Sequence, residues 1–194
     1  WSVASGQQIS LLRAGHCTCH DLTCCHRQVI SIGVVVNENA KAWLLATADS
    51  GGTVTVWDLK AEIPRTYCRG SDYDTYAVAF SPDGTTIAST GRHATRLWDL
   101  ATGRTMLTLK SGNFMTDLAF SPDGRELAVG SITAFNPGQV GVWEVEPDRG
   151  IRKLHGLVAP ISKVQFSPDG QLVGALSNDW QIGIWEIESG RLRQ

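Results

Sequence analysis

The sequence predicts an all-β fold made of repeated four-stranded antiparallel units, and two spaced motifs carry this prediction. The pentapeptide Phe-Ser-Pro-Asp-Gly occurs three times, at residues 80–84, 120–124 and 166–170. An aliphatic residue, a tryptophan and an acidic residue stand together at four points 41 to 45 residues apart, at Trp57, Trp98, Trp143 and Trp185. This period lies in the range of β-propeller blades. We therefore expect a β-propeller of about four blades.

One unit shows how the pattern specifies strands. Residues 76–80 alternate as a short buried strand, which the turn at 81–84 ends: Pro presets φ, Asp favours the next position and Gly accepts a positive φ. Residues 87–90 form the returning strand and residues 94–99 a third strand that carries the tryptophan. A fourth, outer strand is expected at 105–109.

Applying this unit to the whole chain divides it into blades and a leading segment. The polar turn after the tryptophan recurs at residues 1–7, 98–104 and 185–191, so the chain begins and ends at the same point of the repeat. A leading outer strand is expected at about 7–12. The expected segments are an outer strand of a preceding blade at 1–15, a Cys/His-rich insert at 16–27, and blades at 28–70, 71–110, 111–155 and 156–194.

The chain resembles the WD-repeat β-propeller family over nearly its whole length. The resemblance rests on the repeated Phe-Ser-Pro-Asp-Gly, on Trp57-Asp58 and Trp98-Asp99, and on Trp-Glu variants at positions 143 and 185. It implies a hydrogen-bond set that joins a His, a Ser or Thr, an Asp and the Trp of each blade. Blade 4 offers His155, Ser177, Asp179 and Trp185. Blade 1 offers, across inserts, His16, Thr47, Asp49 and Trp57.

Two blades depart from the family pattern. Blade 2 has Arg92 where the Asp would sit, and before blade 3 the family's Gly-His pair is replaced by Gly112-Asn113.

Propellers that resemble this family close with seven or eight blades, so about three blades are missing. The first expectation is a fragment of a seven- or eight-bladed ring. The alternatives are a four-blade ring closed by the leading strand and closure by a second copy.

The repeated residues are expected to be structural. Asp83, Asp123 and Asp169 each follow Pro and precede Gly, so turn formation explains them better than a catalytic or calcium-binding role. The four tryptophans are expected to pack between blades, so that their removal would destabilise the protein rather than inactivate it.

The most unusual segment runs from His16 to His26 and holds seven Cys and His residues. Thiolates and imidazoles are zinc ligands, but the Cys-x-Cys and Cys-Cys spacings differ from the Cys-x2-Cys pairs of structural zinc modules. We therefore expect a variable loop, no metal and no cofactor. A metal-binding or redox-sensing loop stays open as the alternative, with candidates Cys17, Cys19, Cys24 and Cys25.

Interaction residues are expected on the face formed by the loops that precede the first strand and follow the second strand of each blade. That face carries Asp72 to Asp74, Arg92, His93, Asn113, Phe114, the insertion 133–137, Asn178 and Trp180. Large aromatic residues and Arg are the usual anchors of protein interfaces. The hypothesised contacts with a partner are Tyr73, Arg92, Phe135 and Trp180.

Composition and motifs narrow the function. A net charge of -2 favours neither nucleic acid nor an anionic membrane, and no apolar run has the length of a membrane-spanning helix. Phosphate-binding, nucleophile-elbow and His-Glu-x2-His motifs were not found, so an enzyme such as a propeller hydrolase is the least favoured class. Four of the five cysteines lie between positions 17 and 25 and do not follow the repeats as a disulfide framework would, which favours an intracellular, cytoplasmic protein. The expected function is a non-enzymatic scaffold for protein or peptide partners, with the missing blades supplied by a longer chain or by self-association.

Overall fold

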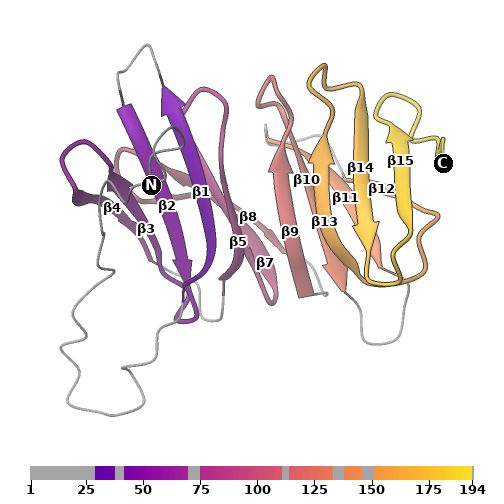
Figure 1. Ribbon diagram of the computed structural model, residues 1–194, viewed down its shortest axis with the longest axis horizontal. Coiled ribbons are helices and arrows are strands. Elements are labelled where there is room, and N and C mark those ends of the chain that lie inside the picture. Colours follow the sequence, from indigo (N-terminus) through magenta and orange to yellow (C-terminus); the bar gives the residue numbers. More distant parts are fainter. Residues whose placement is uncertain are drawn as a thin grey trace, which may run out of the picture.

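A computed structural model shows an all-β architecture of four antiparallel sheets (Figure 1). The structure describes residues 29–37, 42–69, 75–110, 114–132, 138–145 and 151–193. The predicted fold class, an all-β protein built of blade-like repeats, is confirmed. The leading strand at 7–12 and the Cys/His-rich insert at 16–27 lie outside the described residues.

Each sheet is a meander in which consecutive strands pair. The first sheet consists of β1 (Val29–Asn37), β2 (Ala42–Asp49), β3 (Val54–Asp58) and β4 (Ile63–Cys68). The second consists of β5 (Thr75–Phe80), β6 (Thr86–Gly91), β7 (Ala94–Asp99) and β8 (Thr105–Lys110). The third consists of β9 (Phe114–Phe120), β10 (Glu126–Ile132), β11 (Gln139–Glu144) and β12 (Ile151–Leu154). The fourth consists of β13 (Ile161–Phe166), β14 (Leu172–Ser177) and β15 (Ile182–Glu186).

The fourth sheet has three strands and the start of an outer edge. Leu192 forms an isolated antiparallel bridge with Trp185, and the amide of Arg193 donates to the carbonyl of Ile184 at 2.7 Å. The chain after the last tryptophan therefore begins to pair with β15 as β8 pairs with β7.

The four sheets stand in an open row, with the first and the fourth at opposite ends (Figure 1). Each sheet packs on the next mainly through its first strand, so β5 lies between β1 and β9, and β9 lies between β5 and β13. Among the described strands, no comparable packing joins the fourth sheet to the first. The described sheets thus do not form the closed four-blade ring that was one alternative.

Apolar side chains fill the spaces between neighbouring sheets. Between the first two sheets, Leu44 and Val56 meet Val78, Ile87 and Trp98 in one buried cluster. Similar clusters lie between the second and third sheets and between the third and fourth sheets. Every inner strand is therefore buried on a face that a single sheet could not cover.

The first strand of each sheet contains a β-bulge at the same place. The unpaired residues are Ile30, Tyr76, Thr116 and Ser162. A bulge re-aims the neighbouring side chains. After two of these bulges a polar side chain reaches the next sheet: Ser31 Oγ accepts a hydrogen bond from the amide of Val78 at 3.3 Å, and the Asp117 carboxylate accepts one from the amide of Val164 at 2.9 Å.

Candidate functional site

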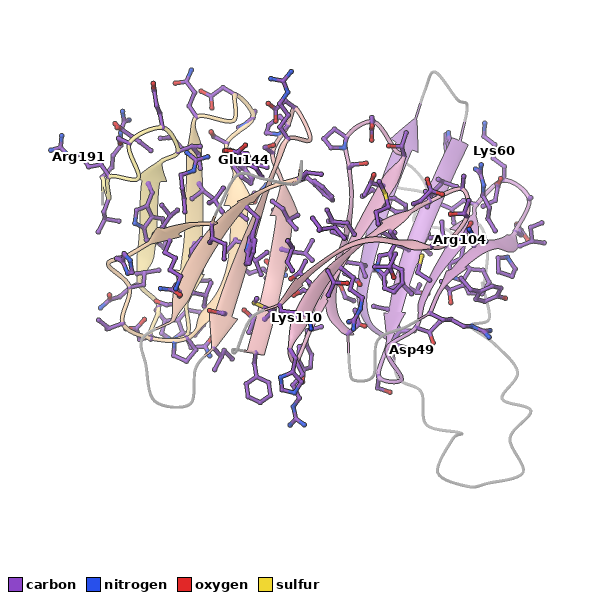
Figure 2. The ribbon with its side chains drawn as sticks, turned by 180° about the vertical axis from the view of Figure 1, so that it is seen from behind. Asp49, Lys60, Arg104, Lys110, Glu144 and Arg191 are labelled. Atoms are coloured by element: carbon purple, nitrogen blue, oxygen red, sulfur yellow. The ribbon has the colours of Figure 1, made fainter. Side chains whose placement is uncertain are left out.

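Because successive strands run in opposite directions, the connections of each sheet divide between two faces. The SPDG face carries the Ser-Pro-Asp-Gly turns at 81–84, 121–124 and 167–170. The variable face carries the turns at 50–53, 92–93 and 178–181, together with residues 155–160 and the start of β9. In Figure 2, Asp49 and Lys110 lie toward the variable face, whereas Lys60, Glu144 and Arg191 lie toward the opposite end of the sheets.

The three SPDG turns share one hydrogen-bond pattern and satisfy their own polar groups. In the third sheet, Ser121 Oγ donates to the Asp123 carboxylate at 2.6 Å and accepts from the amide of Glu126 at 2.9 Å. The same carboxylate accepts from the amide of Arg125 at 3.1 Å, and Gly124 has a φ of 74°. The turns at Ser81 and Ser167 repeat these bonds. Little is left for a ligand on this side.

The same bonds set the acidity of the turn carboxylates. The pKa values of Asp83, Asp123 and Asp169 lie below the ordinary value, because the hydroxyl of the Ser two residues before each Asp donates to its carboxylate. The amide two residues after each Asp lowers the pKa further. A hydrogen bond to the charged form favours ionisation. These carboxylates are therefore structural acceptors, in agreement with the turn-forming role expected from Pro-Asp-Gly.

On the variable face, the turns of the first and fourth sheets are equivalent but carry different residues. In the first, the amides of Asp49 and Gly52 donate to the carbonyls of Thr53 and Asp49. In the fourth, the amides of Ser177 and Trp180 donate to the carbonyls of Gln181 and Ser177, so Trp180 occupies the position of Gly52.

This shared position requires a left-handed backbone. Gly52 has a φ of 74° and Trp180 a φ of 67°. Glycine adopts such a φ without a steric penalty, whereas a bulky residue in this region is an outlier that costs of order 1 kcal/mol or more. The fourth sheet thus presents a large aromatic residue at a strained position where its sister turn uses glycine.

Trp180 is also the most exposed large apolar residue among the described positions, at 84%. Two further exposed apolar side chains belong to the same corner, Val158 at 67% and Ile182 at 62%. The amide of Asn178 donates to the carbonyl of Pro160 at 2.8 Å, which holds the turn against the segment that carries Val158. We call Val158, Trp180 and Ile182 the apolar patch.

The second sheet has a shorter turn, formed by Arg92 and His93. Thr90 and Thr95 close it with a buried hydroxyl–hydroxyl bond of 2.8 Å. Both turn residues are exposed and reach toward the third sheet: the Arg92 guanidinium carbon lies 5.0 Å from the centroid of the Phe114 ring, and the His93 and Phe114 ring centroids are 6.2 Å apart. The sequence analysis placed these three residues on one face, and the structure brings them into contact.

Lys110 adds a second cation beside this turn. It is exposed at the end of β8, directly opposite Ala94, the first residue after the turn (Figure 2). We call Arg92, Lys110 and Phe114 the basic–aromatic cluster. It spans the boundary between the second and third sheets, whereas the apolar patch belongs to the fourth.

The hydrogen bonds of the tryptophans differ from the set that the family resemblance implied. In the fourth sheet, Ser177 Oγ donates to the Asp179 carboxylate, but the Trp185 indole donates to the backbone carbonyl of His155 at 2.9 Å. The His155 imidazole and the Ser177 hydroxyl therefore do not receive the indole bond that the implied set assigns to blade 4.

The cross-strand neighbours explain this difference. In the first and second sheets the indole N–H groups of Trp57 and Trp98 bond to Thr47 Oγ1 at 3.0 Å and Ser89 Oγ at 2.8 Å. The equivalent residue of β14 is Ala175, which faces Gly183 and has no side-chain acceptor. The Trp185 ring packs over Gly183, where a side chain would collide with it, and its N–H finds a main-chain partner.

All four tryptophans form part of the sheet packing, but not equally. Trp57, Trp98 and Trp185 are buried, whereas Trp143 is half-buried and packs at the edge of the cluster between the second and third sheets.

Several candidate residues lie outside the described part of the chain. These are the partner contacts Tyr73 and Phe135 and the metal candidates Cys17, Cys19, Cys24 and Cys25. Within the described residues, no group of three or more His, Cys, Asp or Glu side chains has a metal-binding arrangement. Burial raises the pKa of Cys68 to about 11, so this thiol is held in its neutral form.

The sequence analysis missed three residues of the variable face. Lys110 was not included because the outer strand was expected to end at residue 109. Val158 and Ile182 were overlooked, although a Val between Gly156 and Pro160 is a signal for an apolar loop residue. The pairing of the Trp180 turn with the Gly52 turn does have a sequence signal, because Gly52 and Trp180 each stand five residues before the tryptophan of their blade, Trp57 and Trp185, although the two tetrapeptides share no residue.

The chain is also similar in sequence to known proteins. A family profile, WD domain, G-beta repeat, matches residues 64–99, which run from the outer strand β4 to the tryptophan strand β7 of the next sheet. The WD repeat-containing protein SL1-17 of Schistosoma mansoni is 32% identical over 166 residues, which cover 83% of this chain and 53% of the relative.

Two further relatives have similar coverage. The small ribosomal subunit protein RACK1y of Oryza sativa is 30% identical over 70% of this chain and 41% of its own length. The cross-pathway control WD-repeat protein 2 of Flammulina velutipes is 25% identical over 85% of this chain and 54% of its own. The chain thus spans about half the length, or less, of these relatives. In the described residues, no helix is long and apolar enough to cross a membrane.

Proposed function

Because the chain belongs to the WD40-repeat family, we propose that it acts as a non-enzymatic scaffold that binds protein or peptide partners through its variable face. WD-repeat proteins typically act as interaction scaffolds, and the finer assignment to this face is the proposal. We also propose an intracellular setting, since the relatives include a small ribosomal subunit protein.

The observation that carries the proposal is Trp180. Its side chain is 84% exposed, so it contributes little to the packing of the described residues, and its positive φ costs stability where Gly52 shows a strain-free solution. Strained positions concentrate at ligand-binding sites, and tryptophan is the residue type most enriched at interface hot spots. A binding role accounts for both features of this residue.

The turn that carries Trp180 is held rigidly from three sides. Its two main-chain bonds close the hairpin, the Asn178 amide ties it to Pro160, and Ser177 Oγ donates to Asp179 within it. A loop that is already ordered loses little conformational entropy when a partner docks. The apolar patch around Trp180 can therefore contribute its buried area to affinity with little ordering cost.

The test compares two exposed tryptophans in the full-length protein. Trp180→Gly removes the aromatic contact and relieves the backbone strain, so we expect an unchanged or raised Tm together with loss of partners. Trp43→Ala is the control, because Trp43 is 50% exposed but lies at the start of β2, at the opposite end from the variable face.

The readout is quantitative affinity capture of partners by the wild type and both variants, with thermal unfolding measured in parallel. The proposal predicts that Trp180→Gly loses partners that the wild type and Trp43→Ala retain. Retention of every partner by Trp180→Gly would refute the variable face as the docking surface.

A further inference from the structure

We propose that the partner of the variable face presents an acidic peptide segment, whose carboxylates bind the basic–aromatic cluster of Arg92, Lys110 and Phe114 across the boundary between the second and third sheets. This inference rests on the proposed function and names the chemistry of the partner.

The turn of the second sheet, at Arg92 and His93, has no carboxylate acceptor, unlike the turns of the first and fourth sheets. In the turn of the first sheet, the Asp49 carboxylate accepts the amides of Gly51 and Thr53 at 2.8 and 3.0 Å. In the fourth sheet, Asp179 accepts from Ser177. Arg92 cannot accept a hydrogen bond. The threonine pair closes its turn instead, which leaves the Arg92 side chain to extend toward the next sheet.

Stacking then preorganises Arg92 for a carboxylate. Its guanidinium carbon lies 5.0 Å from the Phe114 ring centroid, within the range of a cation–π contact. A guanidinium held at an aromatic ring keeps its donor fork available, and this fork matches the two oxygens of a carboxylate. Phe114 belongs to β9 of the neighbouring sheet, so the site depends on the packing of the two sheets.

The positive charge of the cluster is not neutralised by the described residues. Their ion pairs join Arg152 with Glu126, Lys163 with Asp117, and Arg193 with Glu186. Neither Arg92 nor Lys110 pairs with a described carboxylate. Arg92 and Lys110 are thus two exposed cations of the variable face without a carboxylate partner among the described residues, on a chain with a net charge of -2.

The same charges favour a peptide over a nucleic acid. Nucleic-acid affinity grows with the number of phosphates neutralised, and proteins that use it carry an extended basic surface. Here the basic–aromatic cluster offers two cations, and the apolar patch of Val158, Trp180 and Ile182 belongs to the same face. An acidic segment with an apolar anchor residue complements both.

The probe is a short fluorescein-labelled glutamate-rich peptide that contains one leucine, with a peptide in which glutamine replaces every glutamate as its control. Binding to the full-length protein is followed by fluorescence anisotropy. We expect the glutamate peptide to bind more tightly than the glutamine peptide and to weaken as salt is raised. Arg92→Gln should reduce its affinity about tenfold, as expected for a lost charge-assisted hydrogen bond.

Matched variants distinguish binding at the basic–aromatic cluster from nonspecific attraction to any exposed cation. Lys110→Gln should weaken binding by a smaller factor, and Arg92→Lys should fall between the wild type and Arg92→Gln because it keeps the charge but not the fork. Arg104→Gln is the control, since it removes an exposed cation from the turn after β7, away from the variable face, and should leave binding unchanged. Equal binding of both peptides, or an equal loss in Arg104→Gln, overturns the inference.

Two further outcomes distinguish this inference from the proposed function. If Trp180→Gly loses partners while Arg92→Gln retains them, and the wild type binds both peptides equally, the docking face stands and the acidic-segment inference is wrong. If a fluorescein-labelled single-stranded oligonucleotide binds more tightly than the glutamate peptide, and this binding depends on Arg92, the cluster binds phosphates. The peptide inference is then also wrong.

Discussion

The SPDG face and the variable face of the same sheets follow opposite rules. On the SPDG face, three turns share one sequence, one set of hydrogen bonds and one glycine conformation, with φ of 68°, 74° and 70° at Gly84, Gly124 and Gly170. On the variable face, the turns differ in length and carry Gly52, Arg92 or Trp180 at their tips. The difference indicates that repetition preserves the architecture, and the binding site that we propose lies where the repeats diverge.

Packing explains why the SPDG turns are uniform. A Cβ added at Gly124 would lie 3.3 Å from Pro82 Cδ of the preceding sheet, and one added at Gly170 would lie 3.4 Å from Pro122 Cδ. Each turn therefore touches the next in a continuous row, and a change in one has to fit its neighbours. The described tips of the variable face show no repeated contact of this kind, so they can carry large side chains.

The largest expected effect separates a buried tryptophan from the exposed one. Trp98 is fully buried and its indole donates to Ser89, so Trp98→Ala should destabilise the protein by about 3–5 kcal/mol. Trp180→Ala should change the free energy of unfolding by less than about 0.5 kcal/mol. Denaturant unfolding of both variants measures the comparison, and similar losses would contradict it.

A smaller effect is expected from the hydroxyl that organises an SPDG turn. Ser121→Ala removes a buried hydroxyl that donates to Asp123 and accepts from the Glu126 amide, two partly buried bonds, so we expect a loss of about 1–3 kcal/mol. The matched control is Ser189→Ala. The Ser189 hydroxyl donates to Glu186 at an exposed turn, so its removal should cost a few tenths of the free energy lost in Ser121→Ala. Equal losses of free energy in the two variants would show that the SPDG hydrogen bonds stabilise the protein no more than those of an exposed turn.

Gly124 and Trp180 have similar positive φ values, so substitutions at the two positions should change the stability of the protein in opposite directions. Gly124→Ala places a Cβ against Pro82 in a backbone of positive φ and should destabilise by about 1 kcal/mol. Trp180→Gly removes a side chain from an equivalent backbone and should be neutral or stabilising. Thermal unfolding of both variants is the measurement; a loss of stability in both would contradict the strain assigned to Trp180.

The smallest effect concerns pH and is confined to the SPDG face. The folded-state pKa values of Asp83, Asp123 and Asp169 are lowered by their serine hydroxyls, so the folded state binds fewer protons than the unfolded state. Their contribution is present above the unfolded pKa of about 3.9 and is lost as the pH falls through the folded values. Replacing all three by Asn should flatten the acid limb of stability, and the free energy of unfolding of the wild type and the triple variant, measured as the pH is lowered, checks this; an unchanged acid limb would contradict it.

Local sequence predicted most of the fold because its signals are local. The Pro-Asp-Gly turns, the alternating strands and the spaced tryptophans specify each hairpin through φ preferences and burial, without reference to distant residues. The contacts of the face were less accessible. Arg92 was selected for its residue type, but its stacking on Phe114 depends on how β9 packs beside the second sheet.

The hydrogen bonds of the tryptophans show the same limit. A family pattern assigned Trp185 to a set with Ser177 and Asp179, whereas the cross-strand register places Ala175 where the acceptor would be, and the indole bonds to the His155 carbonyl. Register follows from the pairing of whole strands and from the bulges within them, which the spacing of single residues does not reveal.

By itself, the sequence determined that the chain forms repeated four-stranded blades, where their turns fall and which residues lie on the variable face, because these depend on backbone preferences and hydrophobic periodicity within each repeat. Only the tertiary structure decided that Arg92 meets Phe114, that Trp180 adopts the positive φ of Gly52, and that Val158 and Ile182 are exposed on the same face. These relations join residues from different strands and sheets, so they arise only once the sheets have packed together.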